Sequence, residues 1–257
     1  MDLNQASALV TGAGSGLGEG TARLLAAAGA RVAVLDRAAE AAEAVAGAIG
    51  GLALAADVSD AEAMEAAFAR LDQEIAARGW PPLRLLVNCA GIGPSRKIVS
   101  SKEGAAPLDA FRQVVEVNLI GSFNALRLAA ERMTAAAPLA DGERGAIVNT
   151  ASIAAFEGQI GQAAYAASKA GIVGLTLPAA RELSRHGVRV ATVAPGVFGT
   201  PMFHTVEPDW RKTITDGVPF PKREGSPEEF ARMVRFIAEN PMANGATYRL
   251  DGALRLA

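Results

Sequence analysis

The sequence predicts a single α/β domain over residues 1–257, with a doubly wound, mostly parallel sheet of about seven strands between two layers of helices. Short apolar runs alternate with longer Ala-rich helical stretches along the whole chain. The runs are continuously apolar, which is typical of strands that are buried on both faces, as in parallel sheets. A chain of 257 residues suits one open sheet of this kind.

Strands and helices follow one another in regular order. Strands are predicted over 7–11, 31–35, 52–56, 83–88, 146–149, 189–193 and 246–250. Helices are predicted over 16–28, 38–49, 60–78, 108–134, 162–184 and 227–239. This alternation favours right-handed crossovers and a doubly wound topology. The stretches 92–107 and 196–226 carry neither pattern and are predicted to be irregular.

The stretch 196–226 is predicted to be a substrate lid. It holds prolines at positions 201, 208, 219 and 221. A long loop in a compact domain usually has a function or is disordered. This one follows the carboxyl end of a strand, the edge at which open α/β sheets bind ligands. We therefore expect it to cover a bound substrate.

Composition excludes several classes of partner. The 25 basic and 27 acidic residues form no block of like charge, so neither nucleic-acid binding nor a polybasic membrane surface is expected. No apolar run approaches the ~18 residues of a membrane span, and the first residues lack a secretory pattern. The single cysteine, Cys89, cannot form an internal disulfide. These features favour a cytoplasmic enzyme.

A glycine-rich turn follows the first predicted strand. Gly12, Gly16 and Gly18 stand between that strand and a helix. Glycine lets a pyrophosphate approach the N–H groups of a helix N-terminus, where the helix dipole favours negative charge. An acidic residue, Asp36, stands about 20 residues further on, at the end of the second strand. This context predicts a Rossmann-type dinucleotide site.

Asp36 favours NAD over NADP. Its carboxylate would accept hydrogen bonds from the ribose hydroxyls. It would also repel a 2′-phosphate ~4 Å away by about 4 kcal/mol per unit charge at an effective dielectric of ~20. Arg37 supports a competing interpretation, because a guanidinium can bind that phosphate. It can equally be a solvated residue that opens the next helix.

Tyr165 and Lys169 are the candidates for acid–base chemistry. Their spacing of four residues in a predicted helix puts both side chains on one face. An ammonium near a phenol lowers its pKa from ~10 toward the operating pH. Ser152 follows the carboxyl end of a strand, where its hydroxyl could bind the reacting oxygen. No cluster of residues has metal-ligand spacing, so no metal is expected.

Combined, these motifs resemble the short-chain dehydrogenase/reductase family over nearly the whole chain. The segment 88–91 is similar to the family's Asn-Asn-Ala-Gly, with Cys89 in place of the second Asn. The resemblance implies hydride transfer between an alcohol carbon and a nicotinamide cofactor. The catalytic set that it implies is Asn118, Ser152, Tyr165 and Lys169, with Asn118 supporting a water-linked proton path. The cofactor contacts that it implies are Gly12, Ser15, Gly16, Leu17, Gly18, Asp36, Asp57, Val58, Cys89, Ala90, Gly91, Tyr165, Lys169, Pro195, Gly196, Phe198 and Thr200.

A narrower resemblance points to one branch of this family, the type II 3-hydroxyacyl-CoA dehydrogenases, also called type 10 17β-hydroxysteroid dehydrogenases. It is carried by 86–92, 150–159, 194–201 and the insertion around 96–107. It implies an NAD-dependent homotetramer that oxidises (S)-3-hydroxyacyl-CoA in fatty acid metabolism, with looser activity on steroids. The implied substrate contacts are Ser152, Gln162 and Tyr165. Gln162 can alternatively cap the helix that follows it.

Other interpretations stay open beside this one. The chain can be another enzyme of the family, such as a 3-oxoacyl-carrier-protein reductase or a steroid or sugar dehydrogenase. It can also be a nucleotide-binding or interaction protein that has lost the chemistry, which the intact catalytic set argues against. Residues 162–177 of the predicted helix 162–184 are apolar nearly all round. The sheet covers only one side of it, so we expect a second subunit on the other.

Overall fold

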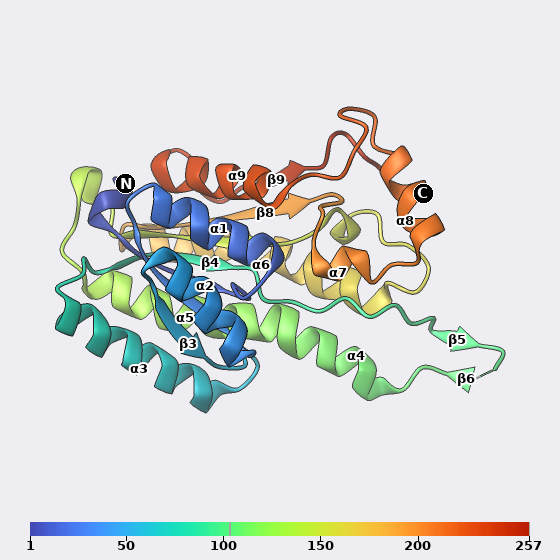
Figure 1. Cartoon of the computed structure of the whole chain (residues 1–257), viewed down its shortest axis with the longest axis horizontal. Helices are drawn as coiled ribbons and strands as arrows, with labels where there is room; N and C mark the ends of the chain where they lie inside the picture. Colours follow the sequence, from blue (N-terminus) through green and yellow to red (C-terminus); the bar gives the residue numbers. More distant parts are fainter. Residues whose placement is uncertain (103, 257) are drawn as a thin grey trace.

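A parallel sheet of seven strands crosses the middle of the computed structural model, which describes residues 1–102 and 104–256. The strand order is β3-β2-β1-β4-β7-β8-β9, and helices cover both faces (Figure 1). The strands are β1 (Ser7–Thr11), β2 (Arg31–Asp36), β3 (Leu52–Ala55), β4 (Leu83–Asn88), β7 (Gly145–Thr150), β8 (Val188–Pro195) and β9 (Thr247–Leu250). The predicted doubly wound fold is confirmed, and so are all seven predicted strands.

Two apolar cores lie on the two faces of the sheet. Within β1, Ala8 and Val10 belong to one core and Leu9 belongs to the other. Alternate strand residues point to opposite faces, so a strand that is covered on both sides must be apolar throughout. The first core is covered by α1 (Gly16–Ala27), α2 (Ala39–Ile49) and α9 (Pro227–Glu239). The second is covered by α3 (Ala61–Arg78), α5 (Gly121–Ala135) and α6 (Ala163–Ser184).

The direction of winding reverses between β1 and β4. The chain builds β2 and β3 on one side of β1, and it builds β4 and the later strands on the other. At the carboxyl ends of these two neighbouring strands, Thr11 pairs with Asn88. Ligands of doubly wound proteins bind in the crevice at such a reversal.

The stretch 196–226 is not irregular throughout, because it contains the helices α7 (Pro201–His204) and α8 (Pro208–Asp216). Thr200 caps α7 by accepting the Phe203 N–H at 3.3 Å, and Glu207 caps α8 in the same way. Each helix has a proline in its first turn, where the missing N–H costs nothing. Here the prolines start helices, so the prediction of an irregular stretch was wrong at these positions.

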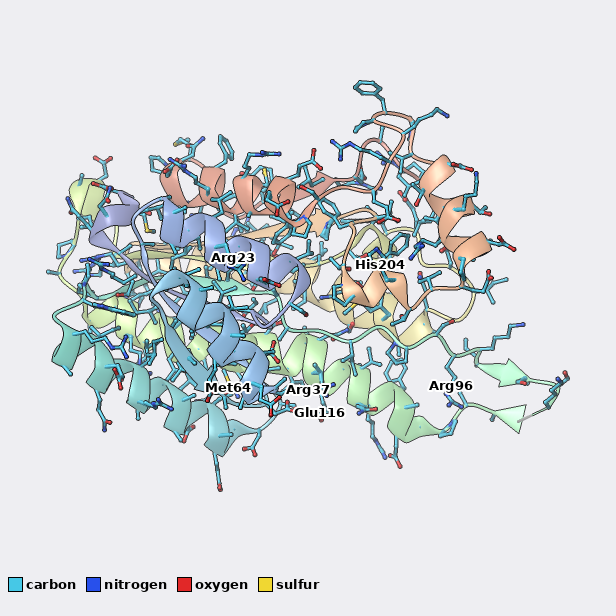
Figure 2. The ribbon with its side chains drawn as sticks, viewed as in Figure 1. Arg23, Arg37, Met64, Arg96, Glu116 and His204 are labelled. Atoms are coloured by element: carbon cyan, nitrogen blue, oxygen red, sulfur yellow. The ribbon has the colours of Figure 1, made fainter. Side chains whose placement is uncertain are left out.

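The stretch 92–107 contains a short antiparallel hairpin of β5 (Val99–Ser100) and β6 (Gly104–Ala105). The hairpin projects from the body of the molecule (Figure 1), and Arg96 lies at its base (Figure 2). Residue 103, within the predicted insertion, lies outside the described residues, as does residue 257.

The predicted helix 108–134 is divided by a π-helical turn. It consists of α4 (Leu108–Val115), the π turn (Glu116–Ile120) and α5. Short 3-10 turns occupy Leu3–Gln5, Ala140–Gly142 and Ile153–Ala155. Across residues 1–102 and 104–256, we find no helix with the length and apolar character needed to cross a membrane.

Candidate active site

The turn between β1 and α1 forms one wall of a groove at the carboxyl edge of the sheet. Gly12 and Gly16 have φ angles of 62° and 55°, in the left-handed region that favours glycine. A Cβ on Gly12 would lie 2.6 Å from the Ala90 Cα atom, and a Cβ on Gly18 would overlap the Gly12 carbonyl oxygen. The glycines are therefore required by the packing of the turn as well as by any ligand that lies on it.

The N-terminus of α1 opens onto this groove. Ser15 is the N-cap residue, but its side chain accepts no hydrogen bond from the helix. The first N–H groups of a helix have no partner within it, and they carry the positive end of its dipole. Ser15, Gly16, Leu17 and Gly18 all line the groove, so an anionic group can approach these N–H groups.

Asp36 ties the glycine turn to the end of β2. Its carboxylate accepts the Gly14 N–H at 3.0 Å and the Ala38 N–H at 3.0 Å, one on each oxygen. A carboxylate offers about four lone-pair sites, so acceptor capacity remains for ribose hydroxyls. Asp36 also lines the groove, where it is only half-buried.

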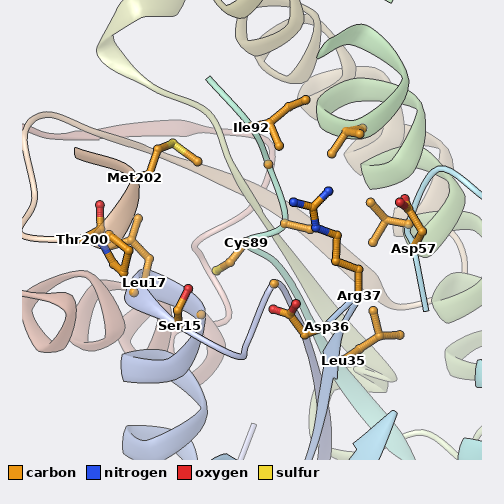
Figure 3. Close-up of a pocket in the computed structure, with 18 of the residues that line it drawn as sticks. Ser15, Leu17, Leu35, Asp36, Arg37, Asp57, Cys89, Ile92, Thr200 and Met202 are labelled. Atoms are coloured by element: carbon orange, nitrogen blue, oxygen red, sulfur yellow. The ribbon is translucent and has the colours of Figure 1, made fainter. Parts of the chain in front are cut away.

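Arg37 extends into the groove between Asp36 and Asp57 (Figure 3). Hydrogen bonds from Ser59 hold the pKa of the Asp57 carboxyl below its usual value, and the charge of Arg37 lowers that pKa further. Arg37 is exposed to solvent. It nevertheless belongs to the lining of the groove, so its charge acts on any ligand bound there.

Cys89, Ala90 and Gly91 continue the groove beyond β4. Burial raises the pKa of the Cys89 thiol to about 11. The thiol is therefore protonated at neutral pH and is not a nucleophile. A Cβ on Gly91 would lie 3.2 Å from the Asn118 Oδ1 atom and 3.5 Å from the Lys169 Nζ atom. Gly91 thus keeps open the space beside the lysine.

Asn118 lies in the π-helical turn and is fully buried. Its Oδ1 atom accepts the Ile92 N–H at 2.8 Å, and its Nδ2 atom donates to the Ile92 carbonyl at 2.9 Å and to Ser168 Oγ at 3.0 Å. The side-chain amide is therefore already hydrogen-bonded to other groups of the protein. A water-linked role for Asn118 would fall to its backbone carbonyl, which accepts a hydrogen bond from Ser122 at 2.7 Å. Such π turns recur at functional sites.

Ser152 and Tyr165 are brought together by the 3-10 turn after β7 and the first turn of α6. Ser152 starts the 3-10 turn after β7, and its Oγ atom accepts the Ala154 N–H at 3.1 Å. Its hydroxyl also acts on the phenol of Tyr165, in the first turn of α6, and lowers the pKa of that phenol. The Tyr165 ring borders Gly93, whose Cβ would lie 3.3 Å from it.

Lys169 lies one helical turn after Tyr165 on the same side of α6. Its Nζ atom is 5.8 Å from the centroid of the Tyr165 ring and donates to the Thr150 carbonyl at 2.7 Å. The side chain is buried, and burial lowers the pKa of Lys169 to about 8. The ammonium is therefore held between the carboxyl end of β7 and the tyrosine ring.

The pKa of Tyr165 is shifted upward, because burial disfavours the phenolate and the hydrogen bond with Ser152 offsets only part of that effect. The lowering that the sequence predicts is not seen. The Lys169 ammonium lies 5.8 Å from the centroid of the ring and donates to the Thr150 carbonyl, and at this position its charge does not outweigh the effect of burial on the pKa of Tyr165. At neutral pH the chain by itself keeps Tyr165 protonated, ready to donate.

The start of α7 closes the groove beside the glycine turn (Figure 3). A Cβ on Gly16 would lie 3.3 Å from Thr200, and the Met202 Sδ atom lies 3.6 Å from the corresponding position on Gly93. Six lining residues are not predicted from the sequence: Leu35, Ala56, Ile92, Val117, Pro201 and Met202. Leu35 and Ala56 stand at or just past strand ends, which was a usable signal. Met202 gave none, because its position depends on the unpredicted helix α7.

Some predicted contacts are not at the groove. The Phe198 ring packs edge-to-face on Phe230 with centroids 6.4 Å apart, inside the first core. Pro195 and Gly196 are absent from the groove lining as well. Gln162 precedes α6, but its side chain accepts the Gln159 N–H at 3.0 Å and caps no N–H of the helix. The capping alternative for Gln162 was therefore wrong.

The residues that are present fit an extended dinucleotide. Asp36 and Asp57 mark one part of the groove, and the unblocked N-terminus of α1 lies where a pyrophosphate would bind. Gly91 leaves space beside Lys169 that any Cβ would fill. Among residues 1–102 and 104–256, no group of three or more His, Cys, Asp or Glu side chains could hold a metal ion.

Known proteins share this sequence and fold. A family model described as short chain dehydrogenase matches residues 6–211. A 3-hydroxyacyl-CoA dehydrogenase type-2 of Bos taurus is 46% identical over 97% of this chain and 95% of that protein. A (3R)-3-hydroxyacyl-CoA dehydrogenase of Homo sapiens is 38% identical over 98% of this chain and 96% of that protein. The crystal structure of a 3-hydroxyacyl-CoA dehydrogenase type-2 from Mycobacterium avium has a TM-score of 0.91 at 41% identity, covering 99% of this chain and 98% of that one.

Proposed function

The chain belongs to the short-chain dehydrogenase family, and from this premise we propose that it interconverts (S)-3-hydroxyacyl-CoA and 3-oxoacyl-CoA with NAD as its cofactor. Membership makes it an oxidoreductase that uses a nicotinamide dinucleotide. The proposal is carried by one observation: Tyr165 and buried Lys169 lie one helical turn apart, with Nζ 5.8 Å from the ring centroid, next to a groove with a glycine turn. The relatives named for 3-hydroxyacyl-CoA support the choice of substrate class.

The side chains divide the chemistry among themselves. When bound, the nicotinamide supplies the site that accepts or gives the hydride. In reduction, Ser152 holds the substrate carbonyl oxygen and Tyr165 donates its phenolic proton to that oxygen. In oxidation, Tyr165 takes the hydroxyl proton back through the same hydrogen bond. Lys169 stabilises the phenolate by its charge, and the Asn118 carbonyl holds a water that passes the proton outward.

The assay that tests this proposal follows nicotinamide absorbance with purified protein, acetoacetyl-CoA and either NADH or NADPH. We expect rapid turnover with NADH and little with NADPH. Turnover only with NADPH would contradict the NAD assignment and would favour a biosynthetic reductase. No turnover with either cofactor, together with measurable NADH binding, would contradict the acyl-CoA substrate. It would favour a steroid or a sugar as the substrate.

The stereochemistry of the substrate needs its own assay, because the similar proteins include a (3R)-3-hydroxyacyl-CoA dehydrogenase. We expect NAD reduction with (S)-3-hydroxybutyryl-CoA and very little with the (R) form. A preference for the (R) form would overturn this part of the proposal while leaving the reaction class in place.

Asp36→Ala is expected to narrow the preference for NADH over NADPH by about 10- to 100-fold in kcat/KM. Removing the carboxylate removes its repulsion of a 2′-phosphate, while Arg37 remains in the groove to attract one. The ratio of kcat/KM for the two cofactors measures the effect. Arg37→Gln is the matched variant, and it should lower the kcat/KM for NADPH more than that for NADH. A wild-type preference for NADPH would show that Arg37, not Asp36, determines the choice between the two cofactors.

We also propose that 196–226 acts as a substrate lid. Thr200 and Met202, at the start of α7, line the groove. Glu224 joins the two lid helices, because it lies 3.5 Å from His204 of α7 and 3.8 Å from Arg211 of α8. These contacts let α7 and α8 move as one cover over the groove.

A homotetramer is our proposal for the assembly. The exposed positions of α6 include Ala163, Ala167, Ala170, Gly174 and Leu177, which form one apolar stripe along the helix. Exposed apolar side chains continue onto α4, the π turn and α5, namely Phe111, Ile120 and Phe123. Contiguous apolar surface of this kind is typical of subunit interfaces. Light scattering should give the mass of four chains, and Phe123→Glu should lower that mass. A monomeric wild type would contradict the proposal.

A further inference from the structure

The last described residues of the chain, 251–256, pack under the active-site loop. Leu254 forms a small buried cluster with Ile153, the residue after Ser152, and with Val218 of the lid segment. Leu256 and Ile214 of α8 pack against the same cluster. The C-terminus accordingly lies beside α8 (Figure 1). The tail therefore contacts both the loop that carries Ser152 and the segment that covers the groove.

An ion pair from β9 and a hydrogen bond from the tail meet at Glu157 of that loop. The Glu157 carboxylate accepts two hydrogen bonds from Arg249 of β9, at 2.8 and 3.1 Å, and one from the Leu256 N–H at 3.2 Å. The Arg249 guanidinium also donates to Asp251 at 2.7 Å and to the Leu254 carbonyl at 3.1 Å. Both side chains of the pair are 23% exposed, so this bidentate pair is partly shielded from water.

Glu157 is connected to Ser152 through a single short turn. The Glu157 N–H donates to the Ile153 carbonyl at 3.0 Å, and the Ala155 N–H donates to the Ser152 carbonyl at 3.0 Å. Arg249 stacks over the ring of Phe156, between these residues, at 5.2 Å. These backbone hydrogen bonds join Glu157 and Ser152 within one turn.

We propose that Glu157 and Arg249 are positioning residues. Through the C-terminal tail they hold the Ser152 hydroxyl against Tyr165, and they hold α8 against the loop that carries Ser152. This inference rests on the proposed roles of Ser152 and Tyr165. A displacement of about 1 Å in a reacting group can cost a hundredfold in rate. The pair acts on the proton-transfer step and not on cofactor binding, because neither residue belongs to the groove lining.

A second ion pair provides the matched control. Glu143 accepts two hydrogen bonds from Arg189, at 2.9 and 2.7 Å, and this pair is more buried than Glu157–Arg249. Arg189 stands near the start of β8, whereas Arg249 stands at the carboxyl edge, near the end of β9. Glu143→Gln therefore removes a comparable carboxylate at the end of the sheet away from the groove.

The test compares E157Q and E143Q with the wild-type chain by kinetics and by amide hydrogen exchange. We expect E157Q to lower kcat for acetoacetyl-CoA by about 10- to 100-fold, with the NADH dissociation constant unchanged within about twofold. Its pH profile should shift upward, because Tyr165 loses the Ser152 hydrogen bond that lowers its pKa. Exchange should accelerate in peptides covering 152–162 and 208–216. E143Q should lose stability without any of these effects.

Two results would overturn the inference. One is an exchange rate in 152–162 that stays at the wild-type level in E157Q. The other is faster exchange in 152–162 of E157Q while kcat and the pH profile stay at their wild-type values. That outcome would give the Glu157–Arg249 pair a structural role only. If the wild-type chain reduces no 3-oxoacyl-CoA, that result contradicts the proposed function and does not decide the role of Glu157. The exchange experiment needs no substrate and still decides whether Glu157 holds the Ser152 loop.

Discussion

Replacing Tyr165 by Phe is expected to lower kcat about a thousandfold, while NADH binds nearly as in the wild type. General acid–base catalysis by one positioned group contributes about 10²- to 10⁴-fold. The phenol is the group that Ser152 contacts, whereas the ring that packs against Gly93 and under Lys169 is kept by Phe. Steady-state reduction of acetoacetyl-CoA measures the loss, and fluorescence titration with NADH measures cofactor binding.

Tyr248→Phe is the matched control, because the chain has only two tyrosines. Tyr248 lies in β9 and packs against the first core, away from the groove. We expect this variant to keep kcat within about twofold of the wild type. Substantial residual turnover in Y165F, or an equal loss in Y248F, would remove Tyr165 from its proposed role.

Replacing Lys169 by Met should lower kcat by about a hundredfold. A unit charge 5.8 Å from the ring stabilises a phenolate by about 3 kcal/mol at an effective dielectric of ~20. That energy corresponds to about two powers of ten in rate. Methionine keeps the length of the side chain without its charge, so kinetics with acetoacetyl-CoA isolate the contribution of the ammonium.

The same substitution should make the folded chain more stable at neutral pH. Burial lowers the pKa of Lys169 from 10.5 to about 8, which corresponds to a cost of about 3 kcal/mol for the charged form. Losing the hydrogen bond to Thr150 offsets part of this, by about 1 to 2 kcal/mol. We expect a net gain of about 1 to 2 kcal/mol in the free energy of unfolding, measured with urea and without cofactor.

The pH dependence of this gain has a definite sign. Between the folded value of about 8 and the unfolded value of 10.5, the unfolded wild-type chain binds more protons at Lys169 than the folded chain. Wild-type stability therefore rises with pH in this interval, whereas the Met variant has no such group. The gain from K169M should shrink between about pH 8 and pH 10. A variant that is less stable at pH 7 and shows no such trend would contradict the buried-charge explanation.

Most of the fold could be predicted because its signals are local. A strand such as β1 is buried on both faces and is therefore apolar at every position. The glycine turn is also a local signal, since Gly12 needs a positive φ and allows no Cβ beside Ala90. Helices α7 and α8 escaped prediction because prolines in first turns resemble loop prolines when the caps are not recognised.

The site could be predicted only in part. The sequence placed Tyr165 and Lys169 on one face of a helix, as the structure has them. It did not predict the direction of the Tyr165 pKa, which depends on burial and on where the lysine charge lies. It also did not predict that the Asn118 side chain is hydrogen-bonded to Ile92 and Ser168. Those facts depend on contacts between residues far apart in the chain.

The sequence alone determined the doubly wound sheet, the glycine turn and the placement of Tyr165 and Lys169 on one face of a helix. Each of these depends on residues at short, regular spacing, where periodicity and backbone freedom act within one element. Only the tertiary structure decided that Arg37 enters the groove, that Phe198 turns into the core, and that Glu157 meets Arg249. These outcomes depend on which distant segments pack together, and the free energy of packing is set by the whole fold and not by any one element.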